Sequence, residues 1–114
     1  MVRLPARAGE SEPAGLTVPP TAQDRTAVEI SITGLVQGVG FRPFVHRLAV
    51  RHGLDGWVRN RSDGTVEFLV QGRSDHIQQM LRWAGRGPSL ARVDDIDTTD
   101  ATYDSDLDSF EIRY

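Results

Sequence analysis

The 114-residue sequence contains no cysteine and no lysine. The absence of cysteine excludes disulfide bonds, thiolate nucleophiles and thiolate zinc sites, and it is typical of proteins from a reducing compartment. Long hydrophobic runs are also absent, so we expect neither a signal peptide nor a membrane span. The sequence therefore predicts a cytoplasmic protein with one domain and one modest core.

Charge is distributed unevenly along the chain. All 13 basic residues are arginines, and the net charge is −3. Residues 94–114 hold eight acids and one arginine, a net charge of −7, which leaves +4 on the rest of the chain. Residues 42–61 carry five arginines and a single acid, which favours a small anionic ligand there. A nucleic-acid partner is not expected, because the whole chain is acidic and this stretch offers few aromatic side chains for base stacking.

Residues 1–26 are rich in Pro, Ala, Gly and Thr and show no helical or strand period, which predicts a disordered tail. Residues 27–114 are expected to form the folded domain, since strand and helix periods follow one another there. The expected strands cover residues 28–33, 55–60, 65–71, 92–97 and 110–114, and the expected helices begin at Phe41 and at the cap Ser74 and end before Gly53 and Gly85.

The order of these elements is βαββαβ, with a last strand or strand extension at the carboxyl terminus. This order predicts an α+β ferredoxin-like fold, in which two helices cover one face of a four- or five-stranded, mainly antiparallel sheet. The first two strands are expected to be parallel, with the third between them. Their carboxyl ends then share one edge of the sheet, which brings the loop after the first strand beside Asn60 at the end of the second.

That loop belongs to the stretch GLVQGVGFR, residues 34–42. Glycines at 34, 38 and 40 allow positive φ angles and let a ligand approach backbone N–H groups at the start of a helix, where the dipole favours an anion. Arg42 adds a guanidinium that can bind a phosphate through two hydrogen bonds. The residues alone leave two readings, an anion cradle or a glycine turn with a solvated arginine. The Gly-Lys-Ser/Thr ending of a P-loop is absent, so a nucleoside triphosphate is not expected.

GLVQGVGFR, GWVRN, DGTVEFLVQG and GPSLARV together resemble the acylphosphatase family over roughly residues 27–114. The resemblance implies a metal-independent hydrolase that acts on small acyl phosphates and uses no cofactor. It implies that Arg42 and the loop amides bind the substrate phosphate and that Asn60 holds the attacking water. The implied phosphate-binding loop consists of Val36, Gln37, Gly38, Val39, Gly40, Phe41 and Arg42.

The acidic and histidine residues of the sequence do not form a metal-binding pattern. An aspartate triplet, Asp104, Asp106 and Asp108, matches the first acids of a calcium loop, but Ser109 stands where that loop needs glycine. The three histidines lack carboxylate or cysteine partners at ligand spacing, and we expect them at surface or packing positions. They are His46, His52 and His76.

Two alternatives remain open at this stage. FRPFVHRLA and PSLARV resemble the amino-terminal domain of the hydrogenase-maturation carbamoyltransferase, which implies carbamoyl phosphate, whereas GWVRNRSDGTVEF resembles free-standing acylphosphatases. We therefore expect a monomer or a part of that larger enzyme. The other alternative is a non-catalytic ferredoxin-like module that binds anions. An RNA-binding sheet is disfavoured, because Ile30, Ser31 and Ile32 stand where exposed aromatics are needed.

Overall fold

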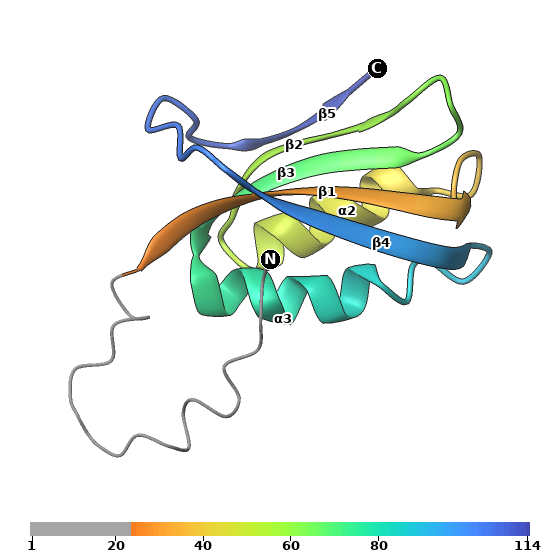
Figure 1. The fold of residues 1–114 in the computed structure, drawn as a ribbon, viewed down its shortest axis with the longest axis horizontal. Coiled ribbons are helices and arrows are strands. Elements are labelled where there is room, and N and C mark those ends of the chain that lie inside the picture. Colours follow the sequence, from red (N-terminus) through yellow and green to blue (C-terminus); the bar gives the residue numbers. More distant parts are fainter. Residues whose placement is uncertain (1–23) are drawn as a thin grey trace, which may run out of the picture.

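The computed structural model describes residues 24–114, which form five strands and two helices (Figure 1). The predicted tail falls outside the described residues up to position 23, and its last two positions, 25 and 26, belong to the first strand. None of the helices in residues 24–114 is long and apolar enough to cross a membrane. In chain order the elements are β1 (Arg25–Leu35), α2 (Phe41–Arg51), β2 (Asp55–Asn60), β3 (Val66–Arg73), α3 (Ser74–Ala84), β4 (Arg92–Ala101) and β5 (Phe110–Arg113).

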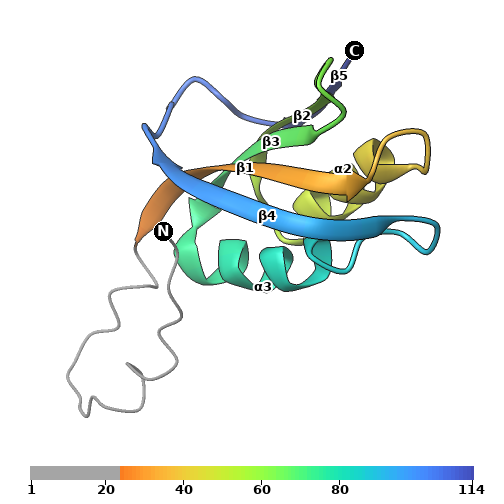
Figure 2. The same ribbon diagram turned by 45° about the vertical axis from the view of Figure 1, so that its right-hand side comes forward.

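The strands form one sheet in the order β4-β1-β3-β2-β5. β1 pairs antiparallel with β3 and β4, β2 pairs antiparallel with β3, and β5 is parallel to β2. Both helices cover the same face of the sheet, as the turned view in Figure 2 shows. The predicted ferredoxin-like α+β fold is therefore confirmed, with β3 between β1 and β2. Because each of these neighbours is antiparallel to β3, β1 and β2 run in the same direction and end at the same edge.

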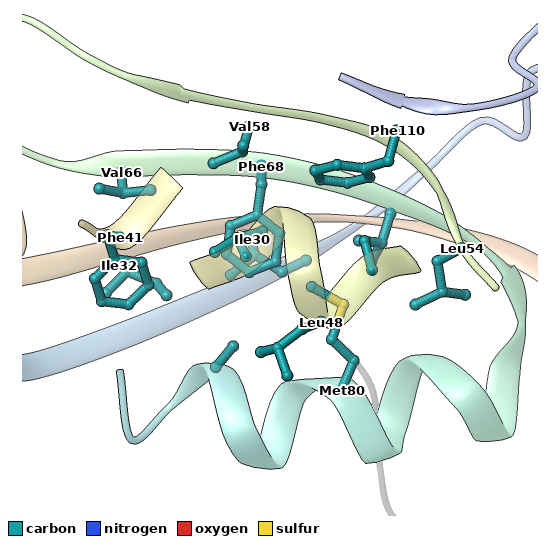
Figure 3. Close-up of a cluster of buried hydrophobic side chains, with 14 of the residues drawn as sticks. Ile30, Ile32, Phe41, Leu48, Leu54, Val58, Val66, Phe68, Met80 and Phe110 are labelled. Atoms are coloured by element: carbon teal, nitrogen blue, oxygen red, sulfur yellow. The ribbon is translucent and has the colours of Figure 1, made fainter. Parts of the chain in front are cut away.

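The hydrophobic core lies between the sheet and the two helices (Figure 3). Ile30 of β1 and Phe68 of β3 point from the sheet toward Leu48 of α2 and Met80 of α3, and all four side chains are buried. Full burial of such a side chain contributes about 1.5–3 kcal/mol. The buried face of α2 recurs at the spacing of a helix and consists of Phe41, Val45, Leu48 and Ala49.

Ser74 is the first residue of α3 and not its N-cap, so the predicted cap is wrong. The N-cap position belongs to Arg73, whose side chain makes no capping hydrogen bond. Its guanidinium binds the Asp75 carboxylate at 2.7 Å, and the Ser74 N–H donates to the carbonyl oxygen of Asp24 at 3.3 Å. β3 runs directly into α3 without a loop, so the last strand residue takes the position that a capping loop residue would otherwise hold.

Gln71 of β3 is fully buried although its side chain is polar. Its Nε2 donates to the carbonyl oxygen of Asp104 at 2.7 Å, and its Oε1 accepts from the Asp104 N–H at 3.0 Å. These bonds attach the connection between β4 and β5 to β3. Gln71 pairs with Asp55 of β2, so the attachment lies at the opposite end of the β2–β3 ladder from Asn60. The aspartate triplet is thereby tied to the sheet far from the end of β2.

We predict that Gln71→Ala lowers the free energy of unfolding by about 2–3 kcal/mol, because both backbone groups of Asp104 lose their partners. Denaturant unfolding measures the loss. Gln79→Ala, the same change at an exposed position of α3, is the control and shifts stability by no more than about 0.5 kcal/mol. Equal effects of the two substitutions would contradict this account of Gln71.

Candidate active site

Three connections meet at the edge of the sheet where β1 and β2 end. They are residues 36–40 after β1, residues 61–65 after β2, and residues 85–91 before β4, and Figure 1 shows all three at one end of the molecule. A Cβ added to Gly87 would lie 3.0 Å from Cε2 of Phe41. The third connection therefore packs against the first residue of α2.

The chain between β1 and α2 turns through Gly38 and Gly40, whose φ angles are +78° and +85°. We call residues 36–42 the cradle. Among the turn and loop hydrogen bonds of residues 24–114, none of ordinary length and angle is donated by the backbone N–H groups of residues 38–42. These donors stand at the start of α2, where the partial positive charge of the helix dipole lies. Unpaired N–H groups in this arrangement bind oxyanions.

Both ends of the cradle are anchored in the core. Val36 and Phe41 bury their side chains completely or nearly so, and the ring of Phe41 contacts that of Phe44 edge to face, with 5.7 Å between centroids. Val39, between the two glycines, is partly buried. The side chains of these residues therefore hold the backbone in place, and the cradle offers a ligand its main-chain groups.

Gly34 belongs to β1 and not to the cradle. It lies at a bulge where the register between β1 and β4 shifts, and its φ angle is +133°. A Cβ at this position would clash with the carbonyl oxygen of Arg92. The prediction that Gly34 lets a ligand approach the loop is therefore wrong. The absence of a side chain at this position allows β1 and β4 to lie close together at the bulge.

Arg42 lies in the first turn of α2 and is partly buried. Its guanidinium carbon is 4.5 Å from the ring centroid of Tyr114, a cation–π contact. Among residues 24–114, no carboxylate forms an ion pair with Arg42. A guanidinium without a carboxylate partner keeps its charge and its N–H donors for an external anion.

Asn60 is the last residue of β2 and pairs with Val66 of β3. Val58, two positions earlier, is fully buried in the core, so strand alternation directs Asn60 to the same face of the sheet, which the helices cover. Its side chain is partly buried and has no hydrogen-bond partner within the described residues. An amide in this position has its donors and its acceptor available to a ligand or a water.

Gln37 links the cradle directly to the end of β2. Its Nε2 donates to the carbonyl oxygen of Arg61 at 2.7 Å and to that of Thr65 at 2.9 Å. The expected proximity of the loop and the end of β2 is therefore confirmed. Both hydrogens of the amide nitrogen are used, so only the backbone of Gln37 can contribute to an anion site. No sequence pattern indicates this contact, because Arg61 and Thr65 follow Gln37 by 24 and 28 positions in the chain.

The two arginines on either side of Asn60 bind one carboxylate on β3. Glu67 Oε1 accepts from Arg59 Nε at 2.8 Å and from Arg61 Nη1 at 3.1 Å, and the Glu67 side chain is 13% exposed. Partial burial raises the pKa of Glu67, but the hydrogen bonds from the two arginines outweigh it and hold the pKa below 4.5, the ordinary value. Asp63 completes the turn by accepting from the N–H and the hydroxyl of Thr65.

Two of the three histidines make contacts within the fold, and the third, His76, is partly buried on α3. The ring of His46 lies 5.9 Å from that of Phe110, and Nδ1 of His52 lies 2.8 Å from the carbonyl oxygen of Leu48. Within residues 24–114, no three His, Asp or Glu side chains are grouped so that they could hold a metal ion. The candidate site consists of the cradle, which includes Arg42, and of Asn60, and Gln37 of the cradle joins its two sides.

Comparison with known proteins identifies the family. The profile of the acylphosphatase family matches residues 28–112. An acylphosphatase of Nocardioides sp. is 46% identical over 89 residues, which cover 78% of this chain and 89% of that protein. The acylphosphatase structure from Bacillus subtilis matches with a TM-score of 0.74 and 38% identity over 77% of this chain and 98% of that one. Full-length HypF, in its phosphate- and nucleotide-bound form, matches with a TM-score of 0.75 and 34% identity over 80% of this chain but 12% of its own. The chain belongs to the acylphosphatase family.

We predict that Glu67→Gln removes a pH-dependent part of the stability. Because the folded-state pKa of Glu67 is lowered, its contribution is complete above the unfolded-state value and disappears as the pH falls through the folded-state value. The stability difference between wild type and variant should therefore be constant above about pH 6 and shrink below pH 4.5. Denaturant unfolding across this range measures it, and parallel curves down to acid pH would contradict the prediction.

Proposed function

We propose that this protein is an acylphosphatase that hydrolyses a carboxylic-phosphoric anhydride to a carboxylate and inorganic phosphate without a metal ion. The proposal is carried by one observation. In a chain of this family, the cradle presents N–H groups and the guanidinium of Arg42 without protein acceptors among the described residues. Gln37 connects this cradle to the turn that follows Asn60 at the end of β2.

The phosphoryl end of the substrate binds in the cradle. Its oxygens accept from the backbone N–H groups and from Arg42, whose fork of donors matches two phosphoryl oxygens. The same donors neutralise charge on these oxygens as the reaction proceeds, which lowers the barrier without any covalent step. The acyl end carries no group that the cradle must recognise, so the phosphoryl end supplies most of the binding.

Asn60 orients the attacking water. Its amide oxygen accepts a hydrogen bond from the water and directs a lone pair of the water oxygen toward phosphorus. A new bond forms between this oxygen and phosphorus, the bridging P–O bond breaks, and its electron pair leaves on the carboxylate. One proton of the water stays on the phosphate and the other passes to solvent. A carboxylate is a weak base and a good leaving group, so a positioned water and charge stabilisation suffice.

The match to a small part of HypF favours a second candidate, in which this chain serves a larger carbamoyltransferase and its substrate is carbamoyl phosphate. The two candidates share the phosphoryl site and differ in the acyl group. Phosphate release from acetyl, benzoyl and carbamoyl phosphate tests the function and separates them. A strong preference for carbamoyl phosphate supports the second candidate, and no release from any of the three would refute both.

We predict that acyl phosphate hydrolysis survives an excess of a metal chelator, because the proposed chemistry depends on backbone N–H groups, Arg42 and Asn60 alone. Inorganic phosphate should inhibit in competition with the substrate, since the cradle recognises the phosphoryl end. Initial rates with and without chelator and phosphate measure both effects. Activity that disappears with chelator and returns with a divalent ion would overturn the metal-independent mechanism.

We predict that Arg42→Ala and Asn60→Ala differ in their kinetics. Arg42 contacts the phosphate in the ground state and the transition state, so its loss should weaken phosphate inhibition and lower turnover. Loss of Asn60 should lower kcat by about a hundredfold, about 3 kcal/mol, while phosphate inhibition stays near the wild-type value. Asn60→Asp should be comparably inactive, because its carboxylate repels the phosphate.

The control for Arg42 is Arg47→Ala, which removes an exposed arginine from the same helix. It should leave kcat and phosphate inhibition within about twofold of wild type, and all variants should stay folded by circular dichroism. A folded and fully active Asn60→Ala protein would remove Asn60 from the mechanism. The same result for Arg42→Ala would remove Arg42 from the mechanism.

A further inference from the structure

Asn60 is followed by a turn, residues 61–65, that lies outside the pairing of β2 with β3. The pairing of β2 with β3 ends at Asn60 and Val66. From there the turn closes on itself, since the Arg61 N–H donates to the carbonyl oxygen of Thr65 at 2.9 Å and the Gly64 N–H donates to that of Arg61 at 3.1 Å. A strand end next to such a turn opens more easily than the strand centre.

Gln37 reaches from the cradle to the two carbonyl oxygens that close this turn. The oxygens of Arg61 and Thr65 lie on its two sides, and each accepts one N–H of the Gln37 amide in addition to its bond within the turn. A single amide nitrogen thus holds both sides of the turn at once. A carboxylate in its place would present oxygens to oxygens and offer no donor.

Glu67 holds the same strand end from the other face of the sheet. Its single oxygen Oε1 accepts from both arginines that flank Asn60, so residues 59 and 61 are fixed to β3, while the side chain of Asn60 between them has no partner among the described residues. The partial burial of this carboxylate reduces the screening of the ion pairs by solvent. The strand end is therefore held from two directions, and the side chain of Asn60 is left for another partner.

We propose that Gln37 is a positioning residue of the active site, which fixes the separation between the phosphate cradle and the water held by Asn60, and that Glu67 supports it from the opposite face. This inference rests on the proposed acylphosphatase function. Gln37 does not touch the substrate phosphate through its side chain. It acts through Asn60, because a shift of the turn moves the water out of line with phosphorus while the cradle keeps its shape.

The kinetic test compares Gln37→Ala, Asn60→Ala, the double variant and wild type, with Gln79→Ala as a control for the same change at an exposed position. Gln37→Ala should lower kcat about tenfold and leave phosphate inhibition within about twofold of wild type. In the double variant, Gln37→Ala should add little to the loss caused by Asn60→Ala, because it acts through that residue. Gln37→Glu keeps the side-chain size but not the donors, and should not restore kcat.

Hydrogen exchange supplies a readout that does not depend on activity. The N–H groups of Arg61 and Gly64 should exchange faster in Gln37→Ala than in wild type, whereas core amides of β3 keep their rates. Gln37→Glu provides the same comparison if the alanine variant does not fold. Glu67→Ala should also lower kcat without weakening phosphate inhibition, and Glu67→Gln, which keeps the accepting oxygen, should restore most of it.

Three results would overturn the inference while leaving the proposed function intact. They are wild-type kcat in Gln37→Ala, a loss of phosphate inhibition instead of turnover, and fully additive effects in the double variant. If wild type itself releases no phosphate from an acyl phosphate, the proposed function fails. The exchange rates of Arg61 and Gly64 then still decide whether Gln37 holds the turn.

Discussion

The antiparallel pairing of β3 with both β1 and β2 is the constraint on which the rest of the structure depends. Val66 of β3 pairs with Ile32 on one side and with Asn60 on the other. Ile32 of β1 and Asn60 at the end of β2 therefore lie two strand spacings apart, about 10 Å, and β1 continues beyond this point to Leu35. A side chain as long as glutamine, placed in the connection after β1, can bridge this distance to the turn after β2, and Gln37 does so.

The sequence alone predicts the architecture, because alternation along the strands and the 3.6-residue period of the helices each have one physical meaning. What it misses are contacts that no period encodes. Gln37 and Gln71 both bind backbone groups of a distant connection, and any polar residue type would look the same in a pattern. The errors at Gly34 and Ser74 have a related cause, since a strand bulge and a strand that continues directly into a helix use residue types typical of loops and caps.

Charge along the chain is a weaker guide than the fold. The five arginines of residues 42–61 suggest one basic surface, yet the structure separates them. Arg59 and Arg61 bind Glu67, and Arg47 and Arg51 lie exposed on α2, so only Arg42 stands at the cradle without a carboxylate among the described residues. The acids of β4 lie on an edge strand, where charge opposes pairing with another sheet.

An anion-binding protein and an enzyme can share the same cradle. Binding requires the unpaired N–H groups at the start of α2 and the charge of Arg42, and neither depends on where β2 ends. Catalysis also requires a group that faces the bound phosphate from a second element and holds water instead of a protein partner. In the proposed mechanism Asn60 has this role, and its neighbours support it, because the arginines beside it bind the Glu67 carboxylate and Gln37 binds the carbonyl oxygens of the turn. Within residues 24–114 the partly buried amide of Asn60 gains no side-chain hydrogen bond to the protein, and in the proposed mechanism a water supplies the missing partner.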